Sequence, residues 1–304
     1  MSEAFKSGFV SLIGLPNAGK STLLNALIGQ KVAIVADKPQ TTRTSVQGVL
    51  TVPGAQIVFV DTPGIHKADT PLNKRLMQTV RANLEERDLL LFVADATRPF
   101  EDADRHALDL AGKTGTPVVL VLNKIDLVKE KAKLLPLIEE YQRAFNFAEY
   151  IPVSATRKDG LDDLQRIILA HLPQGPAYFP EDYITDQPER FLAAELIREK
   201  ILQATRQEVP HSIAVSIDKW EDSPRLTRIF ATIRVERDGQ KAIVIGAKGS
   251  MLKRIGTLAR EEMERLFDIH IYLDLHVRVQ PGWREQPAFL NTLDWRTMAG
   301  EDDH

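Results

Sequence analysis

The 304-residue sequence contains no cysteine, so a disulfide-stabilised fold and a metal centre of thiolate ligands are both excluded. The absence of cysteine also fits a reducing compartment. No apolar run approaches the roughly 18–20 residues that a membrane-spanning helix requires. The first residues lack the basic start and apolar core of a secretory signal. These absences lead us to expect a cytoplasmic protein.

A strong excess of charge of either sign is missing as well. The net charge is −3, and 27% of the residues are charged and 43% hydrophobic, which is typical of a globular chain. A near-neutral total neither favours nor excludes a nucleic-acid partner, so charge has to be read locally. At this length the chain can form two ordinary domains, each with its own core.

Residues 1–172 alternate between short apolar runs and segments of helical periodicity. Apolar strands separated by helices are typical of a doubly wound α/β domain with a mostly parallel sheet. In such sheets, ligands bind beyond the carboxyl ends of the strands. The expected strands are Phe9–Ile13, Ile57–Val60, Leu89–Ala94, Val118–Leu122 and Ile151–Val153.

A proline-rich segment, residues 173–189, is expected to be a linker or a surface strap that marks the boundary to a second domain at residues 190–304. No internal repeat relates the two halves, so we expect two different folds. The second is predicted to be an α+β domain. Its expected elements are a helix Arg190–Arg206, strands His211–Lys219 and Thr227–Glu236, an apolar run Ala242–Ile245, the tetrad Gly246–Gly249, a helix to Phe267 and a strand Ile269–Val279.

Directly after the first expected strand, Gly14–Ser21 matches the pattern GxxxxGK[ST]. Glycines let such a P-loop turn its backbone N–H groups toward phosphates, and the following helix adds its positive dipole end. We expect Lys20 to reach the β- and γ-phosphates and Ser21 to hold Mg²⁺. The alternative is an ordinary glycine-rich turn. The predicted phosphate-site residues are Gly14, Leu15, Pro16, Asn17, Ala18, Gly19, Lys20, Ser21 and Thr22.

A second motif, Asn123-Lys124-Ile125-Asp126, follows a later strand. The carboxylate of Asp126 can accept from both N1–H and the exocyclic amine of guanine, whereas adenine offers an acceptor and no amine there. A site built this way discriminates by roughly 10⁴. Alone, the motif is more often a surface turn, but after a P-loop it predicts binding of GTP and GDP. Residues expected to complete the base site are Leu127, Ser154, Ala155 and Thr156.

The segments Asp61–Gly64 and Gln40–Arg43 are predicted to sense the γ-phosphate. Asp61 is expected to hold Mg²⁺ through a water, and the Gly64 peptide can reorient when the phosphate leaves. A threonine completes the Mg²⁺ shell while the γ-phosphate is bound, and of Thr41 and Thr42 we favour Thr42. The alternative is a simple capping threonine. Further expected nucleotide contacts are Thr62, Pro63 and Ile65.

Ile65 stands where many GTPases carry a glutamine that orients the attacking water. An aliphatic side chain cannot do this, so we expect slow hydrolysis that depends on Mg²⁺, Lys20, Thr42 and the Gly64 backbone. The Asn17 amide oxygen could bind K⁺ beside the phosphates, where negative charge develops. Alternatively, Asn17 only fixes the loop by a local hydrogen bond.

These motifs carry a resemblance to a known family. The P-loop with Pro16 and Asn17, the Gln40–Arg43 segment and the aliphatic residue after Gly64 resemble the Era branch of the translation-associated GTPases. The resemblance covers residues from about 8 to 295. Ala18, where the family usually has valine, and the acidic tail Glu301–His304 depart from it. In the second half, the segments similar to the Era KH domain are Arg190–Lys200, Glu208–His211, Val235–Lys241 and Val244–Gly249.

The KH interpretation also has physical support. Gly246 and Gly249 let a backbone turn approach a nucleic-acid backbone, and Gly239–Arg260 carries five Lys/Arg and no acid. The run Ala242–Ile245 and Ile255 are predicted to line a groove for bases. The alternative for a lone GxxG is a loop between two elements. The predicted RNA-binding residues are Ile245, Gly246, Ala247, Lys248, Gly249, Ser250, Lys253 and Arg254.

The Era resemblance implies a type II KH domain that binds 16S ribosomal RNA near its 3′ end. It further implies a role in assembly of the 30S subunit, a monomeric protein, and peripheral association with the inner face of the cell membrane. A competing hypothesis is an RNA-binding chaperone whose nucleotide site is vestigial. A partner of tRNA modification is disfavoured, because such proteins need a catalytic cofactor domain for which no residues remain.

Overall fold

The computed structural model describes residues 4–38, 40–66, 71–205, 209 and 212–293, and the chain divides into two compact units. The first unit comprises residues 1–33, 42–69 and 73–186. The second comprises residues 34–41, 70–72 and 187–304. The short segment 34–41 therefore groups with the second unit, although it lies early in the sequence. Within the described residues, no helix is long and apolar enough to cross a membrane.

The first unit contains a six-stranded sheet in the order β2-β3-β1-β4-β5-β6. All neighbouring strands are parallel except β2 and β3. This confirms the predicted doubly wound, mostly parallel domain, although strand β2 was not predicted. The P-loop follows β1, whose neighbours in the sheet are β3 on one side and β4 on the other. The strand order changes direction at this point, and sheets of this kind bind ligands there. The strands are β1 Lys6–Ile13, β2 Val46–Val52, β3 Ala55–Asp61, β4 Leu89–Asp95, β5 Val118–Asn123 and β6 Glu149–Pro152.

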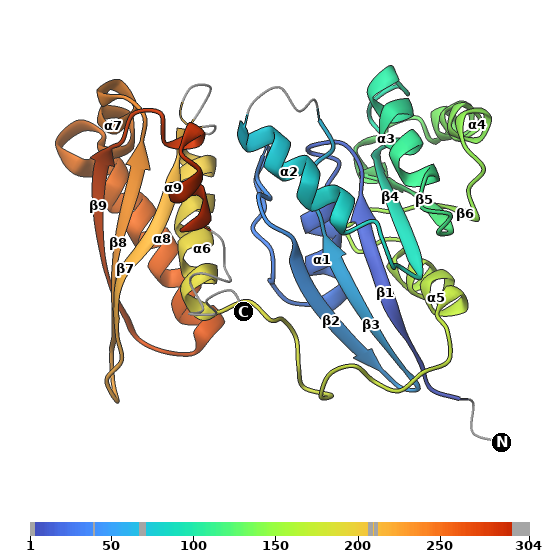
Figure 1. Ribbon diagram of the computed structural model, residues 1–304, viewed down its shortest axis with the longest axis horizontal. Coiled ribbons are helices and arrows are strands. Elements are labelled where there is room, and N and C mark those ends of the chain that lie inside the picture. Colours follow the sequence, from blue (N-terminus) through green and yellow to red (C-terminus); the bar gives the residue numbers. More distant parts are fainter. Residues whose placement is uncertain (1–3, 39, 67–70, 206–208, 210–211, 294–304) are drawn as a thin grey trace. The chain divides into compact units, whose positions relative to one another are not determined.

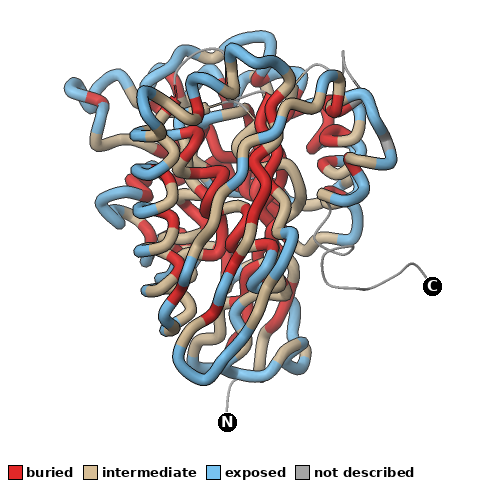
Figure 2. The backbone as a smooth tube through the Cα atoms, turned by 90° about the vertical axis from the view of Figure 1, so that its left-hand side faces the viewer, coloured by how far each residue is buried: buried red, intermediate tan, exposed pale blue. Residues whose placement is uncertain are grey.

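Helices cover both faces of this sheet (Figure 1). Val10 and Leu12 of β1 face one core together with α1 and α5, whereas Ile13 of β1 faces a second core with α2, α3 and α4. Throughout the described chain, buried residues concentrate in the strands, and exposed residues concentrate in the loops and on outer helix surfaces (Figure 2). The helices are α1 Lys20–Ile28, α2 Pro71–Ala82, α3 Asp102–Gly112, α4 Leu134–Ala144 and α5 Leu161–His171, with short 3-10 turns at Ile125–Leu127 and Lys131–Lys133.

The proline-rich segment after α5 is bound to the sheet rather than suspended between units. Ser7 donates through its backbone N–H to Pro173 O (3.1 Å) and through its hydroxyl to Pro176 O (2.6 Å). The Gln56 side-chain oxygen accepts from the N–H groups of both Tyr178 and Phe179 (2.8 and 3.0 Å). These bonds satisfy polar side chains that are buried, since Ser7 and Gln56 are 1% and 0% exposed, and a buried polar group without a partner is costly. The boundary between the two units in this part of the chain falls between residues 186 and 187.

The second unit contains a three-stranded sheet, ordered β7-β8-β9, with β7 and β8 antiparallel and β8 and β9 parallel. Helices α6, α7 and α8 contribute to one buried core with the inward residues of these strands. This is the predicted KH-type α+β domain. Its elements are α6 Glu189–Ala204, β7 Ala214–Glu221, β8 Thr227–Val235, α7 Asp238–Ile245, α8 Ser250–Phe267, β9 Ile271–Val279 and α9 Pro287–Asn291, with 3-10 turns at Ala247–Gly249 and Trp283–Glu285.

Two expectations for this unit need correction. The apolar run Ala242–Ile245 forms the last turns of α7, so a helix that was not predicted precedes the glycine tetrad. Ile255 does not line a groove: its side chain is fully buried in the core, as is that of Val244. Both lie on the inward faces of their helices, because a helix that packs on a sheet turns its apolar stripe toward it.

Candidate functional sites

The P-loop between β1 and α1 is held in a conformation that requires its glycines. Gly14 and Gly19 have positive φ values of 141° and 92°, as does Asn17 with 62°. A Cβ atom at Gly14 would lie 2.2 Å from Val93 O, and one at Gly19 would lie 2.3 Å from the Asn123 Nδ2 atom. Helix α1 then begins at Lys20 with no acidic residue in its first turn. Its N-terminus is thus suited to an anion.

Lys20 is buried beneath this loop. Its ammonium donates to the carbonyl oxygens of Gly14 (3.1 Å) and Leu15 (2.9 Å). Burial lowers the pKa of Lys20 to about 8, against the opposing effect of the Asp61 carboxylate. An anionic phosphate placed in the loop would favour the charged ammonium.

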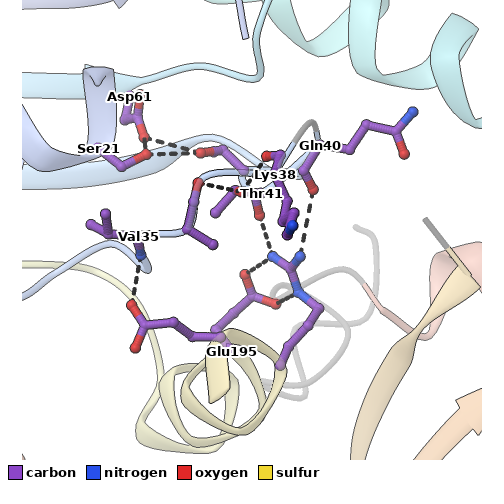
Figure 3. A network of polar contacts seen from close by, with 11 residues as sticks. Ser21, Val35, Lys38, Gln40, Thr41, Asp61 and Glu195 are labelled. Carbon is purple, nitrogen blue, oxygen red and sulfur yellow. Dashed lines mark hydrogen bonds and ion pairs between the residues drawn. The ribbon is translucent and has the colours of Figure 1, made fainter. Parts of the chain in front are cut away.

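Three oxygen-bearing side chains converge at the start of α1 and the end of β3 (Figure 3). The Ser21 hydroxyl donates to Asp61 Oδ2 (2.5 Å) and lies 2.9 Å from the Thr42 hydroxyl, which donates to the same carboxylate oxygen (3.3 Å). Asp61 is fully buried, and among the described residues its Oδ1 atom has no hydrogen-bond partner. Burial raises the pKa of Asp61, opposed mainly by Lys20.

This cluster fits a magnesium ion. Mg²⁺ prefers oxygen ligands and is commonly held by one or two carboxylates or hydroxyls together with substrate phosphates. A buried carboxylate oxygen without a partner is costly, and a cation or its bound water would satisfy it. The geometry favours Thr42 over Thr41, whose hydroxyl donates instead to the carbonyls of Lys38 (2.6 Å) and Ala36 (3.2 Å).

The segment after β3 is packed tightly against the P-loop. A Cβ atom at Gly64 would lie 2.7 Å from the N and Cα atoms of Pro16, so only glycine fits. The Ile65 N–H donates to Gly14 O (3.0 Å), while the Ile65 side chain is buried in the core. Ile65 was predicted to contact the nucleotide, but only its backbone faces the phosphate loop, because its side chain points into the core. His66 Nδ1 lies 2.6 Å from Gly64 O, and this contact stabilises the turn at residues 64–66.

The base-site residues are linked to the P-loop by hydrogen bonds. Asn123 donates through Nδ2 to Ala18 O (3.0 Å) and accepts through Oδ1 from the Ala155 N–H (3.1 Å). The Asp126 Oδ1 atom accepts from the Ser154 hydroxyl (2.7 Å). Asn123 thus joins the phosphate loop to the Ser154–Thr156 loop, and Ser154 orients the carboxylate that was predicted to read guanine. Leu127 is 62% exposed beside it.

Two residues that belong to this region were not predicted from the sequence. Asp95, at the carboxyl end of β4, accepts from the Lys124 ammonium (2.7 Å), which also donates to Asn17 O (2.6 Å). Arg157 lies with its Nε atom 4.0 Å from Asp126 Oδ2. Asp95 could have been found, since it ends a strand whose neighbours end in site residues. Arg157 follows no pattern in the sequence.

A groove in the second unit lies beside the glycine tetrad, between α8 and β9. Its volume is about 390 Å³, and it combines leucine side chains with two basic ones. Of the predicted RNA-binding residues, Gly249 and Lys253 line it. The lining residues are Gly249, Leu252, Lys253, Gly256, Thr257, Arg260, Leu273 and Leu275.

The tetrad itself has unusual backbone geometry. Gly246 (φ 71°), Lys248 (φ 51°) and Gly249 (φ 80°) all lie at positive φ. A Cβ atom at Gly246 would lie 2.6 Å from Met251 Cβ, whereas one at Gly249 would meet nothing within 4 Å. Gly246 is thus required for the fold, and Gly249 leaves open space where a ligand backbone can approach. The side chains of Ala247, Lys248, Ser250 and Arg254 are exposed around it.

Comparison with known proteins finds a related family for each half of the chain. The chain matches a family described as "50S ribosome-binding GTPase" over residues 9–124 and one described as "KH domain" over residues 208–284. It is 48% identical to GTPase Era of Geobacter metallireducens, covering 96% of this chain and 98% of that protein. It is 49% identical to GTPase Era of Rippkaea orientalis, covering 97% and 94%.

Two solved structures are similar over nearly their whole length. One is an Era variant of Aquifex aeolicus bound to GDP and AlF4⁻, with 42% identity, a TM-score of 0.92 and coverage of 96% of this chain and 99% of that one. The other is Era in complex with Mg·GDPNP and nucleotides 1506–1542 of 16S ribosomal RNA, with 42% identity, a TM-score of 0.93 and the same coverage. The resemblance stated from the motifs is confirmed.

Proposed function

The chain belongs to the Era family of GTPases, and on that basis we propose that it binds 16S ribosomal RNA near its 3′ end through the groove between α8 and β9. We further propose that it acts in assembly of the 30S subunit. The Era complex with an RNA segment of that region is the relative that supports this assignment. The observation that carries it in this chain is a groove that combines leucine side chains with basic Lys253 and Arg260 beside a GxxG turn.

The phosphate groups of GTP are proposed to lie in the P-loop, where Lys20 offers its ammonium and the N-terminus of α1 its N–H groups. Ser21 and Thr42 would hold Mg²⁺ directly, and Asp61 would hold it through a water. The ion, when bound, offsets charge that develops on the phosphates. The Oδ1 atom of Asp61, which has no hydrogen-bond partner in the described part of the chain, supports this assignment. Replacing Ser21 with alanine should raise the Mg²⁺ concentration needed for half-maximal hydrolysis.

Hydrolysis is proposed to proceed without a side chain that orients water. The Ile65 side chain is buried in the core, so we expect Lys20 and the backbone N–H groups of the loop and of Gly64 to donate to the γ-phosphate. With no orienting glutamine, turnover should lie at about 10⁻⁴ to 10⁻² s⁻¹, the range of unassisted GTPases. Measuring phosphate release in a single turnover tests this.

We also propose that K⁺ binds at Asn17. Asn17 is exposed and lies at positive φ, and among the described residues its side chain makes no hydrogen bond that would fix the loop. Its amide oxygen is thus available to a cation beside the phosphates. Replacing K⁺ by Na⁺ at constant ionic strength should lower the rate of wild-type hydrolysis. Equal rates in the two salts would contradict the K⁺ site and leave Asn17 as a residue chosen for its tolerance of left-handed backbone.

The RNA assignment is tested by binding of a labelled oligonucleotide from the 3′ end of 16S ribosomal RNA, followed by fluorescence anisotropy. Tight binding that an unrelated RNA of equal length does not match would support it. Equal affinity for both RNAs would reduce the groove to a non-specific electrostatic surface.

The competing hypothesis is an RNA-binding chaperone with a vestigial nucleotide site. Against it stand the Ser21, Thr42 and Asp61 cluster and the bonds that join Asn123 to both loops, since a vestigial site would have no need of either.

We propose finally that the protein is a monomer of the cytoplasm and that it associates peripherally with the inner face of the membrane. Light scattering and flotation with vesicles of anionic lipid test these two points.

A further inference from the structure

Residues 34–41, which precede the proposed magnesium ligand Thr42, are bound to helix α6. The Glu199 carboxylate accepts from the Val35 N–H (2.7 Å), and the Gln203 side chain donates to Val35 O (3.1 Å). At the other end of the segment, the Arg198 guanidinium donates to Gln40 O (3.5 Å) and to Thr41 O. All of these residues belong to one compact unit, so α6 fixes the segment at both of its ends (Figure 3).

The Arg198 side chain is buried, and its donors are satisfied by acceptors on both sides. Its side chain is only 2% exposed. Glu195, one turn earlier on α6, accepts from its Nε (2.7 Å) and Nη2 (2.5 Å) atoms. Burying a guanidinium is costly unless its donors are satisfied, and here the carboxylate and the two loop carbonyls share them. The rigid fork of arginine suits this division, and a lysine could not reproduce it.

The carbonyl that Arg198 binds belongs to the peptide that begins Thr42. The Thr41 oxygen and the Thr42 nitrogen lie in one planar group, so fixing the oxygen fixes the plane from which Thr42 projects. The Thr42 hydroxyl lies 2.9 Å from that of Ser21 and 3.3 Å from Asp61 Oδ2. A small rotation of the peptide would move this hydroxyl out of the cluster.

We propose that Arg198, held by Glu195, is a positioning residue for Thr42 and thereby for the hydrolysis of GTP. This inference rests on the proposed role of Thr42 as a magnesium ligand. Arg198 touches neither nucleotide nor metal in this account; it acts through the Thr41–Thr42 peptide. Its role is confined to the state with a γ-phosphate, because only then is Thr42 expected to join the magnesium shell.

The test compares Arg198→Met with Thr42→Ala and with the double variant in single-turnover GTP hydrolysis at varied Mg²⁺. Arg198→Met should slow hydrolysis about 10- to 100-fold, as expected for misplacing a ligand by about 1 Å, and should raise the Mg²⁺ concentration for half-maximal rate. Affinity for GDP should not change. In the double variant the loss should be no greater than for Thr42→Ala alone, since both changes remove the same interaction.

Arg284→Met is the matched control. Arg284 forms a similar two-pronged pair with Glu236 in the same unit (Nε–Oε1 3.0 Å and Nη2–Oε2 2.5 Å), and the described contacts join it to no residue of segment 34–41. Its loss should affect thermal stability without changing hydrolysis. If Arg198→Met does not fold, Arg198→Lys decides the question, with a smaller loss of rate and a smaller rise in Mg²⁺ requirement expected.

Three results would overturn the inference. One is a folded Arg198→Met or Arg198→Lys protein with wild-type rate and Mg²⁺ requirement. Another is a double variant in which the two losses multiply, since that would make the Arg198 effect independent of Thr42. The third is a Thr42→Ala protein that hydrolyses GTP normally, which would overturn the magnesium assignment as well. An impaired Thr42→Ala beside a normal Arg198→Met would overturn only the positioning role.

Discussion

The nucleotide site and the RNA groove are built by different physical means. In the phosphate loop, a Cβ atom at Gly14 or Gly19 would come within 2.3 Å of a neighbouring atom, and Asn123 and Lys124 are bound to the loop backbone. In the groove, a Cβ atom at Gly249 would meet nothing within 4 Å. The first site is defined by backbone geometry and fixed hydrogen bonds, and the second by an open surface of leucine and basic side chains.

This difference predicts how each site responds to change. A site of fixed bonds should fail abruptly when one charged or oriented group is lost, because the remaining groups are left without partners. An open groove should lose affinity in smaller steps, because each contact contributes partly and independently. The substitutions below test this contrast, beginning with the largest expected effect.

Lys20→Ala should give the largest loss. It removes the proposed charge-assisted bonds to two phosphates, worth about 1.5–3 kcal/mol each, so GTP affinity should fall by roughly 10²- to 10⁴-fold. Isothermal titration with GTP measures this, and RNA binding by the same protein is the control. Retained GTP affinity would show that the phosphates bind elsewhere.

Asp126→Asn should change which base is bound rather than abolish binding. An amide offers one acceptor and one donor where the carboxylate offers two acceptors, which suits xanthine better than guanine. GTP affinity should fall by roughly 10²- to 10⁴-fold, and xanthosine triphosphate should become the preferred substrate. Hydrolysis of the two nucleotides in competition checks this. Normal use of GTP and none of the xanthine nucleotide would contradict the base assignment.

Gly249→Asp should weaken binding of the 16S 3′ oligonucleotide by about 10- to 100-fold, because it places a negative charge where a phosphate backbone approaches. Gly249→Asn is the matched control: it has nearly the same size and tolerates the φ of 80° at this position. It should lose less. Anisotropy measures both. Gly246→Asp is unsuitable, since its side chain would collide with Met251 and disturb the fold.

Lys253→Ala should have the smallest effect, a loss of several-fold in RNA affinity. The slope of log affinity against log salt should fall by about one unit for a single lost phosphate contact. Lys113→Ala, an exposed lysine of the first unit, serves as control and should leave the slope unchanged. An unchanged slope in Lys253→Ala would place this lysine outside the RNA interface.

The contrast also explains what could be predicted from the sequence. Gly14, Lys20, Asp61 and Asp126 fall into patterns of fixed spacing, because the chemistry of phosphate and guanine allows few backbone solutions. The structure brings Ser21, Thr42 and Asp61 into contact and joins the loops through Asn123. Asp95 was missed because it falls in no motif of fixed spacing, although its place at the end of β4, between β1 and β5, could have indicated it.

Elsewhere the sequence was ambiguous for physical reasons. The run Ala242–Ile245 is short and apolar, and periodicity cannot tell a buried strand from a helical turn over so few residues. Strand β2 lies at the edge of the sheet and carries polar residues among its apolar ones, so its signal is weak. Residues 173–186 are held in place by tertiary hydrogen bonds, such as those of Gln56. No local sequence pattern encodes bonds of this kind.

The most direct test of the central claim is single-turnover GTP hydrolysis by the wild-type protein and by Gly249→Asp, each with and without the 16S 3′ oligonucleotide. The resemblance to Era suggests that the two domains communicate, so we predict slow basal hydrolysis of equal rate in both proteins, acceleration by RNA in the wild type, and no acceleration in Gly249→Asp. If the wild-type protein hydrolysed no GTP under any of these conditions, the result would contradict the assignment as a GTPase. It would favour the hypothesis of an RNA-binding chaperone with a vestigial nucleotide site. Equal acceleration of both proteins would contradict the assignment of the groove.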